Sequence, residues 1–233
     1  MKKTIGILGG MGPLATADLF RKIIDNTQAG CDQDHLRVVI DSNTNIPDRT
    51  AAILHGGEDP VREMVRSGLA LEGMGADLLI MPCNTAHYFY DRIAPFFNIP
   101  LLNMLEETAG EIQRRGISTV GLLATDGTIQ AGVYDKPLAS RGIQVLKPSP
   151  EGQQRVMEVI YQGVKAGNYQ LDISGFLKVL DGLFVQGAQV VILGCTELPV
   201  AFDRFAIHRP HIDPTLVLAR AAIREAGGQW KKG

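Results

Sequence analysis

The sequence predicts an α/β fold made of two pseudo-symmetric domains, each with a parallel sheet. Short runs rich in Val, Ile and Leu recur along the chain, and segments with helical apolar spacing lie between them. Apolar runs without polar alternation are typical of parallel strands that are covered on both faces, and strands that alternate with helices are typical of α/β folds. Two of the segments also recur in similar form in the second half, which indicates an internal duplication.

The elements follow from these patterns in chain order. Strands are predicted at residues 4–8, 36–40, 77–81, 119–123, 143–146 and 190–193. Helices are predicted at residues 15–29, 60–75, 106–115, 151–166, 174–186 and 214–226, and several of them end at a glycine that can serve as a C-cap. We expect the last helix to pack on the first half, and only residues 227–233 to be frayed.

The duplication defines the domains and the place of the site. Residues 4–10 resemble residues 119–125, and residues 75–81 resemble residues 187–193. We therefore expect an N-terminal α/β domain formed by residues 1–102 plus 210–233 and a C-terminal α/β domain formed by residues 103–209. Because ligands of open α/β sheets bind at the carboxyl ends of the strands, the sequence predicts an active site in the cleft between the domains.

Composition limits the class of partner. The chain has 233 residues, is 45% hydrophobic and carries a net charge of -2, with no long basic run. These values favour a large core and a small-molecule ligand, and they argue against nucleic acid or a membrane surface as a partner. The longest apolar runs are too short for a spanning helix or a signal peptide. Three cysteines without metal-ligand spacing indicate no disulfide framework and no metal site, so a cytoplasmic location is expected.

Two similar boxes carry the strongest chemical signal. Cys83 and Cys195 each follow a predicted strand directly and precede a Thr-containing turn where a helix is expected to start. A helix N-terminus lowers the pKa of a thiol from its usual value of about 8.5, although cysteine is also common as an inert core residue. A thiol from each half would suit a reaction that removes a proton from one face of a carbon and returns it to the other. Cys31 lies in a polar turn and is expected to be a bystander.

The glycine-rich segment 9–15 allows two interpretations. It satisfies the pattern G-x-G-x-x-A after a strand, which would suggest a dinucleotide with Asp41 as the ribose acceptor. A nicotinamide enzyme would leave the two cysteine boxes unexplained. We therefore prefer a turn whose backbone N–H groups hold a carboxylate at the start of the next helix.

Four further residues have a functional and a structural interpretation each. Arg49 could bind a substrate carboxylate through two parallel hydrogen bonds, or it could be a solvated loop residue. Lys165 could be a second cation for the substrate or could interact with the helix dipole. Thr125 could line the cleft or serve turn chemistry, and His87 could orient or ionise Cys83 or be a buried structural histidine.

Taken together, these segments resemble the cofactor-independent aspartate/glutamate racemase family along nearly the whole chain. The resemblance rests on residues 9–13, 45–50, 81–87, 165–168 and 194–199, in this order and spacing. Glutamate racemases typically open with Asp-Ser-Gly and carry Cys-Thr-His-Tyr in the second box, whereas this chain has Gly-Gly-Met-Gly and Cys-Thr-Glu-Leu. The aspartate branch is therefore favoured, and the presence of both cysteines implies racemisation in both directions.

The resemblance implies a homodimer of two-domain subunits that interconverts L- and D-aspartate with no cofactor. By this resemblance Cys83 and Cys195 are the catalytic bases. His87 and Glu197 lie near them in the sequence and are candidates for supporting residues. The expected substrate-binding residues are Met11, Gly12, Arg49, Asn84, Thr85, Thr125, Lys165 and Thr196.

Other functions stay open on the sequence alone. A racemase of glutamate or of another amino acid, or a dicarboxylate isomerase or decarboxylase, would use the same scaffold. An NAD(P)-dependent oxidoreductase would use the glycine-rich turn. A binding module without catalysis would not need two intact cysteines.

Overall fold

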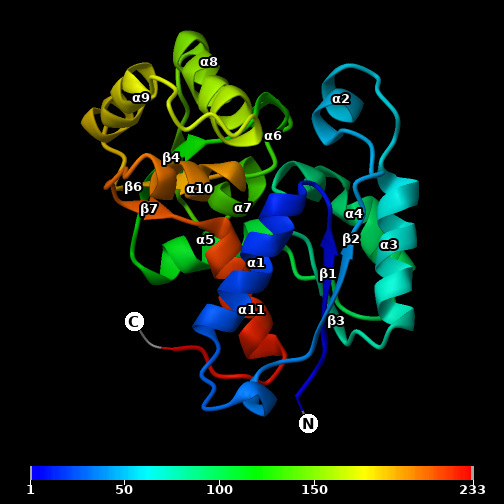
Figure 1. Cartoon of the computed structure of the whole chain (residues 1–233). Coiled ribbons are helices and arrows are strands. Elements are labelled where there is room, and N and C mark those ends of the chain that lie inside the picture. The colour runs from blue at the N-terminus through cyan, green and yellow to red at the C-terminus, as the bar shows by residue number, and fades with distance from the viewer. Residues whose placement is uncertain (1, 232–233) are drawn as a thin grey trace. The chain divides into compact units, whose positions relative to one another are not determined.

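The computed structural model describes residues 2–231 (Figure 1). The chain divides into two compact units: unit 1 is Met1–Glu107 with Thr215–Gly233, and unit 2 is Thr108–Pro214. Each unit has its own parallel sheet with helices around it, so the predicted α/β class and the two parallel sheets are confirmed. The domain boundaries given above, at residues 102 and 210, stay a prediction.

Unit 1 is built on a sheet of three parallel strands in the order β2-β1-β3. These strands are β1 (Ile5–Gly9), β2 (Val38–Ser42) and β3 (Leu78–Ile80). The helices of this part of the chain are α1 (Pro13–Asn26), α2 (Arg49–Leu54), α3 (Val61–Gly73), α4 (Tyr90–Ile93) and α11 (Pro214–Glu225), with short 3-10 turns at Asp32–Asp34, Thr85–Phe89 and Ala94–Phe96. Helix α5 (Met104–Arg114) runs from the end of unit 1 into unit 2.

The core of unit 1 lies on both faces of its sheet. On one face, Ile7 packs with Leu19 of α1 and with Leu218 and Ile223 of α11. Figure 1 shows the red α11 beside the blue α1. The expectation that the last helix returns to the first half is therefore confirmed.

Unit 2 is built on a sheet of four parallel strands in the order β5-β4-β6-β7. These strands are β4 (Thr119–Leu123), β5 (Gln144–Leu146), β6 (Val190–Leu193) and β7 (His211–Ile212). Its helices are α6 (Asp126–Gln130), α7 (Asp135–Ala139), α8 (Pro150–Glu158), a π-helix at Val159–Lys165, α9 (Ser174–Val185) and α10 (Glu197–Arg204). The helix predicted at residues 151–166 is thus α-helical only up to Glu158.

The repeat seen in the sequence is present in the backbone pairing. Gly6 of β1 lies opposite Leu79 of β3, and Gly121 of β4 lies opposite Val191 of β6. A Cβ atom on Gly6 would lie 2.7 Å from Leu79 Cδ2, and one on Gly121 would lie 2.9 Å from Val191 Cγ1. Each central strand therefore needs a glycine at the same position.

The polar contacts at the start of the third strand also repeat. The side chain of Asp77 accepts a hydrogen bond from the Thr4 N–H at 2.7 Å, and the side chain of Gln189 accepts one from the Thr119 N–H at 3.1 Å. In unit 1, Leu101 forms a parallel bridge with Leu79, which corresponds to the place of β7 beside β6 in unit 2. The two units are therefore versions of one topology.

Further parts of the fold differ from the sequence prediction. The short helices α2 and α6 form where only loops were predicted, because Asp48 and Thr125 cap their first turns: Asp48 accepts from the Ala51 N–H at 2.6 Å and Thr125 from the Thr128 N–H at 3.3 Å. The prediction of frayed residues is wrong for residues 227–231. Trp230 forms an antiparallel bridge with Thr27, and the guanidinium of Arg220 lies 4.9 Å from the centre of its ring. Lys232 and Gly233 lie outside the described residues.

The close approach in the central strands leads to a first prediction. Gly121→Ala should lower the free energy of unfolding by about 1–3 kcal/mol, because the added methyl group meets Val191 and Leu183. Gly182→Ala in α9 is the matched control: a Cβ there has open space, and alanine favours the helix by about 0.5–1 kcal/mol. Urea unfolding of both variants gives the comparison, and equal effects of the two substitutions would contradict the packing argument.

Candidate active site

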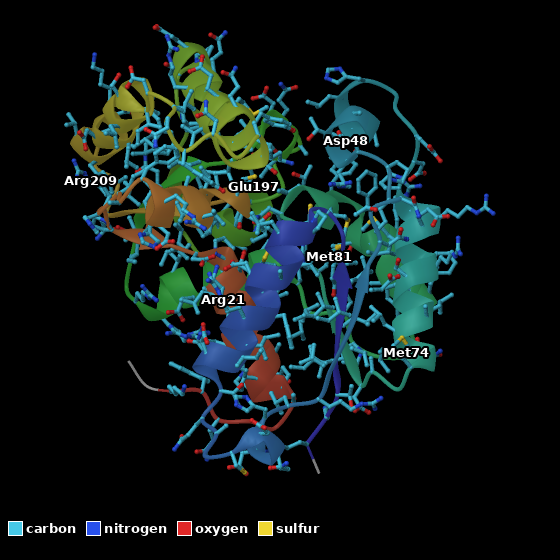
Figure 2. The ribbon with its side chains drawn as sticks, viewed as in Figure 1. Arg21, Asp48, Met74, Met81, Glu197 and Arg209 are labelled. Atoms are coloured by element: carbon cyan, nitrogen blue, oxygen red, sulfur yellow. The ribbon has the colours of Figure 1, made fainter. Side chains whose placement is uncertain are left out.

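Cys83 lies in a turn just beyond the carboxyl end of β3. Its side chain is buried, with a relative exposure of 7%, and its N–H donates to the carbonyl of Met81 at 2.9 Å. Figure 2 labels Met81, from which the chain leads through Pro82 into this turn. The helix that follows starts as a 3-10 helix at Thr85–Phe89. The expected position between a strand and a helix is confirmed, whereas the function of Cys83 stays a prediction.

His87 contacts the backbone of Cys83. Its Nε2 accepts a hydrogen bond from the Met104 N–H at 3.1 Å, so Nδ1 carries the ring proton and donates to the Cys83 carbonyl at 2.8 Å. Burial lowers the pKa of His87 to about 4. The neutral His87 therefore links the carbonyl of Cys83 to the backbone at the start of α5. It positions the cysteine turn through this carbonyl.

Cys195 is the counterpart in unit 2, beyond the carboxyl end of β6. It is also buried, with a relative exposure of 7%, and its Sγ donates to Glu197 Oε2 at 2.9 Å. The Thr196 hydroxyl donates to the same oxygen at 3.3 Å. Burial and the negative charge of Glu197 raise the pKa of the Cys195 thiol well above its ordinary value. The prediction of a lowered thiol pKa is therefore wrong for Cys195, because desolvation and the neighbouring carboxylate outweigh the helix N-terminus.

Lys165 reaches the same carboxylate. It ends the π-helix, and its Nζ lies 3.5 Å from Glu197 Oε1 and 5.0 Å from the centre of the Tyr161 ring. The π-helix packs against α10 through apolar residues such as Ile160 and Leu198. Figure 2 labels Glu197 at the start of α10. Tyr161 is not among the residues predicted from the sequence, although its position four residues before Lys165 is a signal that could have indicated it.

The glycine-rich turn joins β1 to α1. Gly10 has a φ of 89°, and a Cβ there would lie 2.3 Å from the backbone of Asn43, so only glycine fits. The Gly10 N–H donates to the Thr16 hydroxyl at 2.9 Å, and that hydroxyl donates to the Gly12 carbonyl at 2.9 Å. The G-x-G pattern therefore has a local structural reason, and the Gly10 N–H already has an acceptor within the turn. Met11 is buried beside it.

Arg49 binds three backbone carbonyls. Its Nη1 donates to Ile46 at 3.1 Å and to Pro47 at 2.9 Å, and its Nη2 donates to Met11 at 3.3 Å. Its Nε is buried and has no hydrogen-bond partner within the described part of the chain. Arg49 is therefore a structured residue that ties the start of α2 to the glycine-rich turn, and the solvated-loop interpretation is wrong.

Thr125 lies at the carboxyl end of β4, where it caps α6. Its hydroxyl donates to the Thr128 hydroxyl at 3.2 Å. The amide of Gln153 braces the same turn by donating to the Ala124 carbonyl at 2.9 Å and to Asp126 Oδ1 at 2.8 Å. Gln153 was also missed from the sequence, because its contact spans two elements that are far apart in the chain.

The predicted residues thus gather at the carboxyl edge of their own sheets, where α/β proteins bind ligands. The cysteine turn and the Arg49–Met11 contact lie at this edge in unit 1, and the linked group of Cys195, Glu197 and Lys165 lies at the corresponding edge in unit 2. Across residues 2–231, no cluster of three or more His, Cys, Asp or Glu side chains is placed to hold a metal ion. In the same part of the chain, none of the helices combines the length and the apolar character that a membrane span requires.

Comparison with known proteins identifies the family. The family model for Asp/Glu/hydantoin racemases matches residues 8–222, which is most of the chain. The chain therefore belongs to the Asp/Glu/hydantoin racemase family and is an isomerase of the amino-acid racemase class.

Three relatives illustrate the similarity. The aspartate racemase of Picrophilus torridus is 34% identical, with a TM-score of 0.88 over 99% of this chain and 96% of that one. An aspartate racemase homologue from Pyrococcus horikoshii is 27% identical, with a TM-score of 0.79 over 97% of this chain and 100% of that one. The broad specificity amino-acid racemase RacX of Bacillus subtilis is 31% identical over 94% of this chain and 96% of its own length.

The buried His87 gives a prediction for pH. Its pKa is about 4 in the folded protein and 6.5 ordinarily, so the unfolded chain takes up the proton first as the pH falls. Stability should therefore be complete above about pH 6.5 and should decrease by about 3 kcal/mol towards pH 4 from this group. His87→Gln should lack this component in urea unfolding followed across the pH range.

The exposed His55→Gln variant is the control for this experiment and should lose stability on acidification as the parent protein does. An equal loss in the His87→Gln variant would contradict the neutral, buried state of His87.

Proposed function

We propose that the protein interconverts the L and D enantiomers of an amino acid by proton transfer to and from two cysteines, with aspartate as the preferred substrate. The observation that carries the proposal is that each repeat of this racemase-family chain presents a buried cysteine at the carboxyl end of the corresponding strand, Cys83 after β3 and Cys195 after β6. Two bases on opposite faces of the α-carbon would account for racemisation without a cofactor.

In the proposed reaction one cysteine acts as a thiolate and removes the α-proton, while the other acts as a thiol and protonates the opposite face. The roles reverse for the other enantiomer. The α-proton of an amino acid is a very weak acid, so the site must stabilise the enediolate that forms on the carboxylate. Donors from Asn84, Thr85 and Thr196 are proposed for this task. The pair of thiols should titrate as one coupled unit.

Two cations are proposed to recognise the carboxylates of the substrate. The Nε–H of Arg49 has no hydrogen-bond partner within the described part of the chain. The Lys165 side chain is 37% exposed and lies beside the carboxylate of Glu197. A substrate with two carboxylates, such as aspartate, uses both cations. The similarity to the aspartate racemase of Picrophilus torridus supports this preference, and glutamate or another amino acid is the alternative favoured by the broad-specificity relative.

The proposal extends to the setting of the enzyme. The three cysteines are all free thiols, which suits a reducing cytoplasm. A homodimer is proposed because the family resemblance implies one.

The first test is racemisation by the purified protein without added cofactor. Incubation with L- and D-aspartate, glutamate and alanine in D₂O, followed by NMR of the α-proton and chiral chromatography, should give exchange with loss of chirality, fastest for aspartate. Faster turnover of another amino acid would show that this amino acid, and not aspartate, is the preferred substrate. Absence of exchange with every amino acid would contradict the proposed function.

The cysteines supply the second test. Cys83→Ser and Cys195→Ser should each lower the rate of racemisation by about 100-fold or more, because each removes one of the two proton-transfer groups. Cys31→Ser is the matched control and should keep the parent rate, since Cys31 is exposed. Racemisation at the parent rate in either of the first two variants would overturn the two-base scheme.

A further inference from the structure

Tyr161 and Lys165 lie on one turn of the π-helix. The Ala166 N–H donates to the Tyr161 carbonyl at 3.1 Å, and the Asn168 N–H donates to the Gly163 carbonyl at 2.8 Å. Hydrogen bonds between residues five apart are those of a π-helix, and such turns are frequent at functional sites. On this turn the two side chains meet, with Lys165 Nζ 5.0 Å from the centre of the Tyr161 ring. The backbone therefore supports a contact between an ammonium group and an aromatic ring.

The Lys165 ammonium has the Tyr161 ring as one neighbour and Glu197 as another. Its distance of 5.0 Å to the ring centre lies within the range of about 6 Å over which a ring face attracts a cation. Its distance of 3.5 Å to Glu197 Oε1 is longer than the roughly 2.8 Å of a charge-assisted hydrogen bond. The Lys165 side chain is 37% exposed and Tyr161 is 40% exposed. The ammonium is thus held in a partly exposed position, where an anionic ligand has access to it.

An aromatic ring differs from a carboxylate as a partner of lysine. A carboxylate cancels the charge of the ammonium, whereas a ring attracts the ammonium and leaves its charge in place. A lysine side chain that becomes ordered only when a ligand binds loses conformational freedom at that moment, which weakens binding. A ring that already orders the side chain removes part of this loss. The contact with Tyr161 therefore prepares Lys165 to bind an anion.

The position of Lys165 indicates which carboxylate of the substrate it would bind. Glu197 Oε2 accepts from the sulfur of Cys195, and Glu197 Oε1 lies beside the Lys165 ammonium, so the carboxylate of Glu197 separates the two groups. In the function proposed above, the sulfur meets the α-carbon, and donors near the cysteines hold the α-carboxylate. An ammonium that is set back from the sulfur suits the carboxylate of the substrate side chain.

Resting on the function proposed above, we propose that Tyr161 is a positioning residue that determines the preference for substrates with an acidic side chain. It acts through Lys165, because its ring holds the ammonium where the side-chain carboxylate of the substrate binds. Loss of the ring weakens the binding of an acidic substrate and leaves proton transfer at the cysteines unchanged. The effect of Tyr161 therefore falls on KM and not on kcat.

The test compares two substitutions of Tyr161 in the racemisation of aspartate. Tyr161→Leu removes the ring and should raise the KM for aspartate about five- to tenfold, with kcat within about twofold of the parent value. Tyr161→Phe keeps a ring and should keep the parent KM within about twofold. A parent-like KM in Tyr161→Leu, or an equal rise of KM in Tyr161→Phe, would overturn the inference.

Gln162→Leu is the matched control for Tyr161→Leu. It places the same side chain at the next position of the same π-helix, which is also exposed. This variant should keep the parent KM for aspartate. A rise of KM equal to that in Tyr161→Leu would show that any disturbance of the π-helix has this effect, and the inference would be wrong.

A double-variant cycle tests whether the effect passes through Lys165. Lys165→Met removes the ammonium and should raise the KM for aspartate at least as much as Tyr161→Leu does. Adding Tyr161→Leu to Lys165→Met should raise it no further, because the group that the ring positions is absent. A further rise in the double variant would give Tyr161 a general structural role and overturn the inference. A parent-like KM in Lys165→Met would overturn it whether or not Tyr161→Leu folds.

This inference and the proposed function fail in different ways. If the parent protein racemises aspartate but Lys165→Met and Tyr161→Leu keep its KM, the inference is wrong and the proposed function stands. If the parent protein racemises only amino acids with neutral side chains, the preference for aspartate and this inference are both wrong, and racemisation stands. If the parent protein exchanges no α-proton at all, the proposed function itself has failed.

Discussion

The close approach of a helix to the central strand in each unit is the constraint on which the rest of the structure depends. Gly6 and Gly121 have no side chain, so Leu79 or Val191 from the neighbouring strand and Leu71 or Leu183 from a helix can fill the space above them. This packing lets the neighbouring strand lie close against the central strand. In each unit that neighbouring strand leads into the cysteine turn. A glycine in the core thus supports the strand that carries each candidate catalytic group.

The same scaffold surrounds its two cysteines with different chemistry. In unit 1 a neutral histidine holds the backbone of the cysteine turn. In unit 2 the carboxylate of Glu197 accepts a hydrogen bond from the sulfur of Cys195 itself, and Lys165 forms an ion pair with the same carboxylate. A duplicated fold gives two similar positions, and substitution at one of them, Thr85 against Glu197, gives those positions different acid–base properties. In the two-base function proposed above, such a difference would let one cysteine start as an acid and the other as a base.

Much of the fold could be predicted from the sequence because its signals are local. All six strands predicted from the apolar runs are present in the structure, and the paired segments of the sequence indicate the repeat. The end of the helix at Glu158 and the ordered residue Trp230 depend on contacts with distant segments, so periodicity could not reveal them. The positions of the cysteines were also predictable, whereas the pKa of Cys195 was not. The pKa of this thiol depends on burial and on a hydrogen bond to Glu197, and the spacing of residues along the sequence indicates neither of them.

The antiparallel bridge between Thr27 and Trp230 has a consequence for the order of assembly. Unit 1 takes its parts from both ends of the chain, while unit 2 is one continuous segment, Thr108–Pro214. A ribosome releases the whole of unit 2 before it releases α11, which supplies Leu218 and Ile223 to the core of unit 1. During synthesis the part of this core that α11 covers therefore stays exposed until α11 has left the ribosome.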